Sequence, residues 1–176
     1  MRIIDKNYID RNKITKYSEQ VSCVQSGNYF EKDGLSYIRL SNLLKYSEYF
    51  KCDSLYSKRT PVFCLNTSEL YFWSNDTEVI TFMKEPSLVF EPIPFKRQFK
   101  KLTDIEPGTY FKRRRNAPSY CVIPYPYYEI QDIQYPLSAG AIPIISLKTG
   151  TMKFINTEEK EIVELVDWEI TMCSVG

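Results

Sequence analysis

The sequence predicts a mainly β protein that consists of two tandem copies of one small barrel, with a short helix inserted in the first copy. Three observations lead to this prediction. Aromatic residues make up 15% of the 176 residues, and their flat side chains pack well on strands. Short apolar runs of strand length are separated by turns rich in Gly, Pro and Asn. The pattern of the first half also recurs in the second half, which indicates a repeat.

Four blocks of the first half recur in the second half in the same order. The matched blocks are residues 21–30 with 102–111, 36–37 with 119–120, 61–72 with 143–154, and 78–82 with 161–165. The offset between partners stays between 81 and 83, and four of the twelve positions in the third pair are identical. Because chance similarity would give scattered offsets, we interpret the pattern as a duplication.

The duplication divides the chain into a first module over residues 1–85, a connector over residues 86–98 and a second module over residues 99–176. In the connector, three prolines alternate with Val, Ile and Phe. Proline restricts the backbone, so we expect a stiff link between the modules and not a flexible one.

Each module is expected to hold about five short strands. The clearest feature is a hairpin in which residues 142–147 and 151–155 flank a turn, with Gly150 where the backbone must be left-handed. Ser68 stands at this position in the first module, so we expect the first turn to differ. So few strands do not make a sandwich, and a flat sheet would expose its edges. A small SH3-like barrel is therefore the predicted architecture of each module.

Each module carries an insertion between its second strand and its hairpin. In the first module, Leu40, Leu43 and Leu44 have helical spacing, which predicts a short helix. In the second module, residues 124–136 combine three prolines with four tyrosines, which is typical of a loop with polyproline character.

The tyrosines of this second insertion are candidate binding residues, because tyrosine offers a large amphipathic contact area at low entropic cost. The candidates are Tyr125, Tyr127 and Tyr128. The alternative is that the insertion folds over the mouth of the barrel and buries them. Trp73 and Trp168 fall on predicted strands, where a core position is the better interpretation.

A basic segment is the strongest local charge signal. Residues 96–115 hold eight Lys and Arg against Asp104 and Glu106. At the tip of the predicted β-turn are Lys112, Arg113, Arg114 and Arg115. Arginine suits phosphate, so this turn predicts contact with a nucleotide or nucleic acid, with the acidic surface of a protein, or with solvent alone.

An acidic segment follows at residues 158–169, with six carboxylates against Lys160. One interpretation is that it pairs with the basic turn of a second copy and gives a homodimer. The other is that it forms the charged outer face of a strand.

Several functional classes are excluded by what the sequence lacks. The chain has no histidine, which removes His-dependent catalysis and His-ligated zinc. It has no nucleotide-binding glycine motif and no nucleophile elbow, and its five cysteines are scattered. We therefore predict a protein that is not an enzyme and uses no cofactor or metal. The sequence shows no signal-peptide pattern and no apolar run of about 18 residues, so we expect a cytoplasmic protein without membrane contact.

The second module resembles a module common in small uncharacterised bacteriophage proteins. The resemblance rests on a Gly-Thr-x-Phe turn at residues 108–111, a Leu-x-Thr-Gly hairpin at residues 147–150 and a closing Val-rich strand at residues 163–166. The first module departs from this pattern at Asn28 and Ser68. The resemblance implies a viral accessory protein that acts in the cytoplasm of an infected bacterium and inhibits a host protein, such as a component of a defence system.

Two functional hypotheses follow. The first is a non-catalytic inhibitor that binds a host protein through Arg113, Arg114, Tyr127 and Tyr128 as its energetically dominant contacts. The alternative is a protein that binds or sequesters a nucleotide or nucleic acid through the arginine-rich turn and nearby aromatic rings.

Overall fold

The computed structural model describes residues 16–50, 58–82, 86–92, 97–113, 119–138, 140–158, 160–166 and 168–174. Strands dominate these residues, so the prediction of a mainly β fold is confirmed. The elements up to the connector are β1 (Lys16–Gln20), β2 (Tyr29–Lys32), β3 (Leu35–Arg39), the 3-10 helix η2 (Leu44–Tyr49), β4 (Arg59–Cys64), β5 (Leu70–Ser74), β6 (Glu78–Phe82) and β7 (Pro86–Pro92). The remaining elements are β8 (Phe99–Lys101), the 3-10 helix η4 (Leu102–Asp104), β9 (Tyr110–Arg113), β10 (Ser119–Val122), β11 (Tyr127–Ile130), β12 (Ile133–Pro136), β13 (Ala141–Ser146), β14 (Met152–Asn156), β15 (Ile162–Leu165) and β16 (Trp168–Ser174). The short helix expected in the first insertion is η2.

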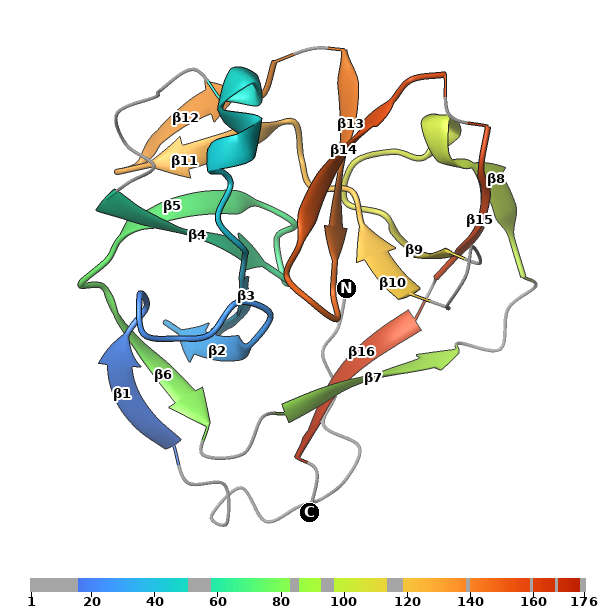
Figure 1. Cartoon of the computed structure of the whole chain (residues 1–176). Helices are drawn as coiled ribbons and strands as arrows, with labels where there is room; N and C mark the ends of the chain where they lie inside the picture. Colours follow the sequence, from blue (N-terminus) through green and yellow to red (C-terminus); the bar gives the residue numbers. More distant parts are fainter. Residues whose placement is uncertain are drawn as a thin grey trace.

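The two modules contain the same arrangement of strands (Figure 1). In the first module the order is β1-β6-β2-β3-β4-β5, and in the second it is β8-β15-β9-β10-β13-β14. Every strand of one list has its counterpart at the same place in the other. Because strand order depends on pairings between residues distant in sequence, this agreement is independent of the matched blocks that indicated the repeat.

The register of the strands tests the matched blocks residue by residue. Pro61 lies opposite Phe72, and Pro143 lies opposite Phe154, which agrees with the offset of 82 in the third block. The fourth block is wrong by one position: Glu31 lies opposite Ile80, and its counterpart Lys112 lies opposite Glu164, so the offset is 84 and not 83. The second block is also wrong by one position. Phe30 lies opposite Tyr37, whereas Phe111, the counterpart of Phe30, lies opposite Cys121. The offset there is 84, because strand pairing and not local similarity sets the register.

The hairpin turns of the two modules have the same geometry, so the expectation that they differ is wrong. Ser68 has φ 61° and Gly150 has φ 63°. The Ser68 amide donates to the Cys64 carbonyl at 2.9 Å, and the Gly150 amide donates to the Ser146 carbonyl at 2.9 Å. The loop length of the hairpin requires a left-handed backbone conformation at this position. Glycine adopts this conformation without steric strain, whereas for Ser68 it is energetically unfavourable.

Closed barrels are not formed by the described strands, which corrects the predicted SH3-like architecture. β5 pairs with β11, and no described strand joins β5 back to β1. The second insertion is therefore not a polyproline loop. It forms the hairpin β11–β12, which extends the first sheet to eight strands in the order β1-β6-β2-β3-β4-β5-β11-β12.

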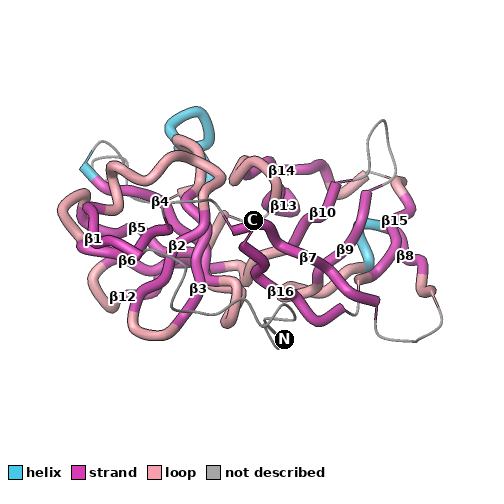
Figure 2. Tube along the Cα trace, turned by 90° about the horizontal axis from the view of Figure 1, so that it is seen from below, coloured by secondary structure: helices cyan, strands magenta, loops and turns pink. Residues whose placement is uncertain are grey.

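Strands β7 and β16 form a separate two-stranded ribbon, seen near the centre of Figure 2. β7 lies in the predicted connector, so this part of the connector is a strand. The two strands are antiparallel, with Val89 opposite Thr171 and Leu88 opposite Met172. The ribbon thus joins the end of the first module to the end of the second.

Each module has its own buried cluster, and apart from Cys64 and Ile123 the two clusters use equivalent positions. In the first module the cluster consists of Val21, Val24, Phe30, Tyr37, Val62, Cys64 and Val79. In the second it consists of Leu102, Ile105, Phe111, Cys121, Ile123, Ile144 and Val163.

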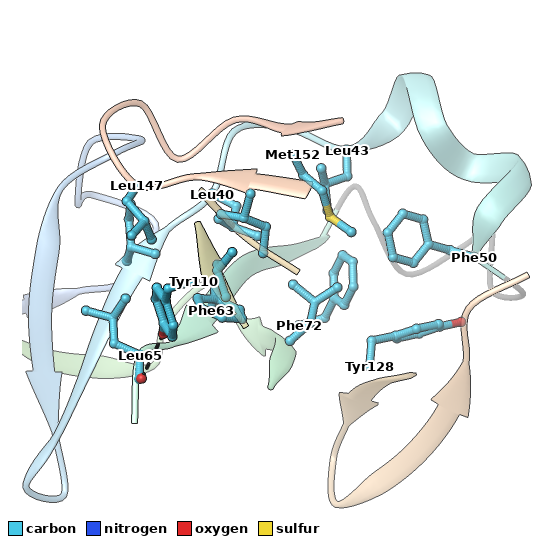
Figure 3. Close-up of a cluster of buried hydrophobic side chains, with 14 of the residues drawn as sticks. Leu40, Leu43, Phe50, Phe63, Leu65, Phe72, Tyr110, Tyr128, Leu147 and Met152 are labelled. Carbon is cyan, nitrogen blue, oxygen red and sulfur yellow. Dashed lines mark hydrogen bonds between the residues drawn. The ribbon is translucent and has the colours of Figure 1, made fainter. Parts of the chain in front are cut away.

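A third cluster is shared between the modules (Figure 3). The first module contributes Ile38, Leu40, Leu43, Phe50, Phe63, Leu65, Leu70 and Phe72. The second module contributes Tyr110, Val122, Tyr128, Ile130, Ile145, Leu147, Met152 and Val166. Along β3 and β10, alternate residues face the module's own cluster and the shared cluster, as the two-residue period of a strand requires. Each sheet therefore buries apolar side chains on both faces.

Reciprocal hydrogen bonds cross the shared cluster. The Tyr110 hydroxyl donates to the Leu65 carbonyl at 2.9 Å, as the dashed line in Figure 3 shows. The Tyr29 hydroxyl donates to the Leu147 carbonyl. Tyr29 is the counterpart of Tyr110, and Leu65 is the counterpart of Leu147. The modules are thus joined as the subunits of a symmetric dimer would be.

Candidate binding surface

The three tyrosines predicted to bind a partner lie on different faces of the sheet. Tyr128 is fully buried in the shared cluster, where its ring packs at 5.2 Å from that of Phe50 and 5.5 Å from that of Phe72. Tyr128 therefore belongs to the core and is not accessible to a partner. The physical reason is strand alternation: Tyr127 and Tyr128 are neighbours on β11, so their side chains point to opposite faces.

Tyr125 and Tyr127 lie on the accessible face. Tyr125 is 38% exposed, and its ring stacks on that of Tyr127 with centroids 5.8 Å apart and planes 12° apart. The Tyr127 hydroxyl donates to Oε1 of Glu69 at 3.1 Å. These contacts hold both rings in fixed positions, so that they lose little side-chain entropy when a partner binds.

The basic turn pairs in part with the acidic segment of the same chain. Arg113 on β9 binds Glu161 through two hydrogen bonds, of which that from Nε to Oε1 is 3.1 Å long. Arg97 Nε lies 3.4 Å from Glu164 Oε1 in a second ion pair. The Lys112 ammonium lies 5.7 Å from the centre of the Tyr120 ring. β15 lies beside both β8 and β9, which brings the two segments together.

This pairing changes the interpretation of the arginines. Arg113 forms an ion pair with the buried carboxylate of Glu161, so it is a weak candidate for a phosphate or partner contact. Arg114 and Arg115 lie outside the described residues.

The structure brings together a set of aromatic rings and carboxylates, of which the sequence predicted only Tyr125 and Tyr127. We name it the aromatic–acidic surface and define it by Glu69, Tyr71, Trp73, Tyr125, Tyr127 and Glu129. It lies at the junction of β5 and β11, where Tyr71 and Glu129 are opposite each other in a parallel pair. The opposite face of the same strands forms the shared cluster, so this face is the one available for contacts outside the chain.

The rings of this surface are continuous with the first module's buried cluster. The Tyr71 and Trp73 ring centroids are 6.0 Å apart. The ring centroid of the buried Tyr37 lies 4.8 Å from that of Trp73. Tyr71 and Trp73 are half-buried. Their inner edges therefore pack on the core, and the rest of each ring remains accessible.

Glu69 is held between two tyrosines. The Tyr71 hydroxyl donates to Oε2 at 2.7 Å, and the Tyr127 hydroxyl donates to Oε1 at 3.1 Å. Burial acts to raise the pKa of Glu69, but hydrogen bonds from Tyr71, Thr67 and Tyr127 outweigh it and lower the pKa. The carboxylate therefore stays ionised.

Glu129 has the opposite shift. Burial raises the pKa of Glu129, and the negative charges of Asp132 and Glu69 raise it further. Among the described residues, neither Glu69 nor Glu129 forms an ion pair with a lysine or arginine. Lys32 lies at the other end of the surface, 6.0 Å from the Trp73 ring centre and paired with Asp33. The described lysines and arginines thus compensate the negative charge at this surface only in part.

The second module provides an internal comparison, because it has the same strand order without this surface. The counterparts are Thr151 for Glu69, Lys153 for Tyr71, Ile155 for Trp73 and Cys121 for Tyr37. The fold therefore does not require the aromatic and acidic residues of the first module. A signal was present in the matched blocks, where Glu69 aligns with Thr151 and Tyr71 with Lys153. The matched blocks did not show that these residues lie beside β11.

Over the part of the chain that the structure describes, no group of three or more Cys, Asp or Glu side chains is arranged to hold a metal ion. Nor is any helix in that part long and apolar enough to cross a membrane. A scan of protein-family models and searches of curated proteins and of solved structures found no match to this chain. The function is therefore inferred from the surface itself.

Proposed function

We propose that this chain is a non-catalytic protein that binds another protein through the aromatic–acidic surface. The observation that carries the proposal is the difference between the modules: two units of one fold differ where the first places fixed aromatic rings and carboxylates on an accessible face. Tyrosine and tryptophan are enriched among the residues that dominate binding energy in protein interfaces.

The identity of the partner is supported by the resemblance to bacteriophage accessory proteins. On this basis we propose that the partner is a protein of the bacterial host, that the encounter takes place in the cytoplasm, and that binding inhibits the partner.

The experiment compares capture of proteins from a bacterial lysate by the wild-type chain and two variants. Tyr125→Ser/Tyr127→Ser removes the stacked pair on the surface. Tyr17→Ser is the matched control, because Tyr17 is 46% exposed and lies on β1, far along the same sheet. The captured protein is identified by mass spectrometry and purified, and its dissociation constant is measured by calorimetry.

We expect the double variant to weaken binding by about 30-fold or more, the effect of losing about 2 kcal/mol at a dominant contact. The control should change the dissociation constant by less than about twofold. Far-ultraviolet circular dichroism checks that each variant is folded. Equal affinity of the double variant and the wild type for the purified partner would refute the proposal.

The nucleic-acid alternative has weaker support in the structure. Its phosphate contacts were expected from the arginine-rich turn, and Arg113 of this turn is paired with Glu161. The ratio of absorbance at 260 and 280 nm tests it directly. A high ratio in the purified protein that falls after a high-salt wash would favour nucleic-acid binding, because phosphate contacts weaken as salt rises.

A further inference from the structure

We infer that the aromatic–acidic surface binds an arginine side chain of the partner, with the guanidinium on the rings of Tyr71 or Trp73 and its N–H groups directed to Glu69. This inference rests on the proposed function, since it names the chemistry that the proposed binding surface recognises. It extends that function from a surface of contact to a class of partner, a protein with an exposed arginine.

The first argument is the carboxylate. Glu69 is ionised, half-buried and fixed by the hydroxyls of Tyr71 and Tyr127. A carboxylate can accept about four hydrogen bonds, and Tyr71, Thr67 and Tyr127 donate to Glu69, so it retains capacity for about one more. An acceptor held in this way suits the N–H groups of a guanidinium, which form strong hydrogen bonds with a carboxylate.

The second argument is charge. Glu129 lies across the strand pair from Tyr71, and Asp132 and Glu69 act on it as like charges. No lysine or arginine in the described ranges forms an ion pair with Glu69 or Glu129. A cation from a partner would therefore relieve a repulsion that exists in the free protein.

The third argument is the rings. Aromatic faces attract cations, and guanidinium also stacks flat on them because it is planar and weakly hydrated. The Lys32 ammonium already lies 6.0 Å from the centre of the Trp73 ring. Lysine from a partner would gain the charge but not the flat stacking on the rings, so the arrangement favours arginine.

The test is a nuclear magnetic resonance titration of the full chain with acetyl-Gly-Arg-Gly-amide. The readout is the indole N–H signal of Trp73, assigned by its loss in Trp73→Phe. Two matched peptides replace arginine with citrulline, which keeps the shape but loses the charge, and with lysine, which keeps the charge but loses the planar fork. Glu69→Gln removes the acceptor charge, and Glu106→Gln, at an exposed position of the second module, is its control.

We expect the arginine peptide to shift the Trp73 signal with saturation. Affinity should fall by about tenfold or more with Glu69→Gln, as for loss of a hydrogen bond to a charged group, and should not change with Glu106→Gln. Absence of a shift, an equal response to citrulline, or equal affinity for the lysine peptide would each overturn the inference.

Failure here is distinguishable from failure of the proposed function. If the arginine peptide does not bind while Tyr125→Ser/Tyr127→Ser still abolishes binding of the captured protein, the surface binds a partner by other chemistry. If the peptide binds but the double variant captures its partner normally, the arginine site exists and the proposed binding surface is wrong.

Discussion

Replacement of Gly150 by alanine tests how closely the second module's hairpin packs against the first module. A Cβ atom at Gly150 would lie 2.7 Å from the Gly27 nitrogen and 3.0 Å from the Gly27 Cα, and closer still to the Arg39 carbonyl oxygen. All three are backbone atoms. They are also tied to one another, since the Gly27 amide donates to the Arg39 carbonyl at 2.8 Å and the Ser41 amide donates to the Gly150 carbonyl at 2.9 Å. The contact cannot be relieved by rotating a side chain.

The expected cost has two parts. Gly150 has φ +63°, and a residue with a Cβ in the left-handed region costs about 1–2 kcal/mol. Insertion of a methyl group into a close-packed contact adds about 1–3 kcal/mol. Gly150→Ala should therefore lower the free energy of unfolding by about 2–5 kcal/mol, a large part of the 5–15 kcal/mol typical of a folded domain.

Gly34→Ala is the matched control. Gly34 has φ +77°, but a Cβ atom there would have no neighbour within 4 Å, so only the conformational cost applies. The free energy of unfolding of both variants is measured by urea denaturation, with far-ultraviolet circular dichroism as the signal. We expect Gly150→Ala to lose at least about 1 kcal/mol more than Gly34→Ala. Equal losses would refute the packing of this hairpin against the first module.

Three further predictions concern the core and its ionisable groups. Tyr110→Phe removes the hydroxyl that donates across the shared cluster, so the free energy of unfolding should fall by about 1–2 kcal/mol; in the same urea assay, exposed Tyr17→Phe should have almost no effect. Burial raises the pKa of Tyr29 and Tyr110, so the unfolded chain releases these protons first, near pH 10. Stability should therefore fall as pH rises above about 10, and less steeply when both are phenylalanine; an equal slope would contradict this reasoning. Burial raises the pKa of Cys121 to about 11, so iodoacetamide at about pH 8 should modify exposed Cys23 first, as peptide mass spectrometry would show. Similar rates at the two thiols would contradict the burial of Cys121.

The accuracy of the sequence-based repeat varied with the kind of residue that defined each block. The block from Pro61 to Phe72 was placed correctly, because proline, a turn and two hydrophobic strands fix its register together. The short matches of residues 36–37 and of residues 78–82 were each wrong by one position. Nothing local fixes the register of so short a strand, which is set by its neighbours in the sheet.

The second insertion shows a different limit. Three prolines and four tyrosines suggested a loop, yet the segment forms β11 and β12. The alternation of polar and apolar residues that marks a strand is absent here, because tyrosine stands both at an accessible position, Tyr127, and at a buried one, Tyr128. One became a surface residue and the other a core residue for a reason that composition does not contain.

The sequence by itself determined that this protein is mainly β and built from a repeated unit, because strand preference and the order of matched blocks are local properties of the chain. Only the tertiary structure decided that the two units share a core and that Glu69 meets Tyr127, 58 positions away. That meeting depends on the pairing of β5 with an insertion from the other module. Such a pairing is selected by packing of the whole molecule, and no segment of the sequence specifies it alone.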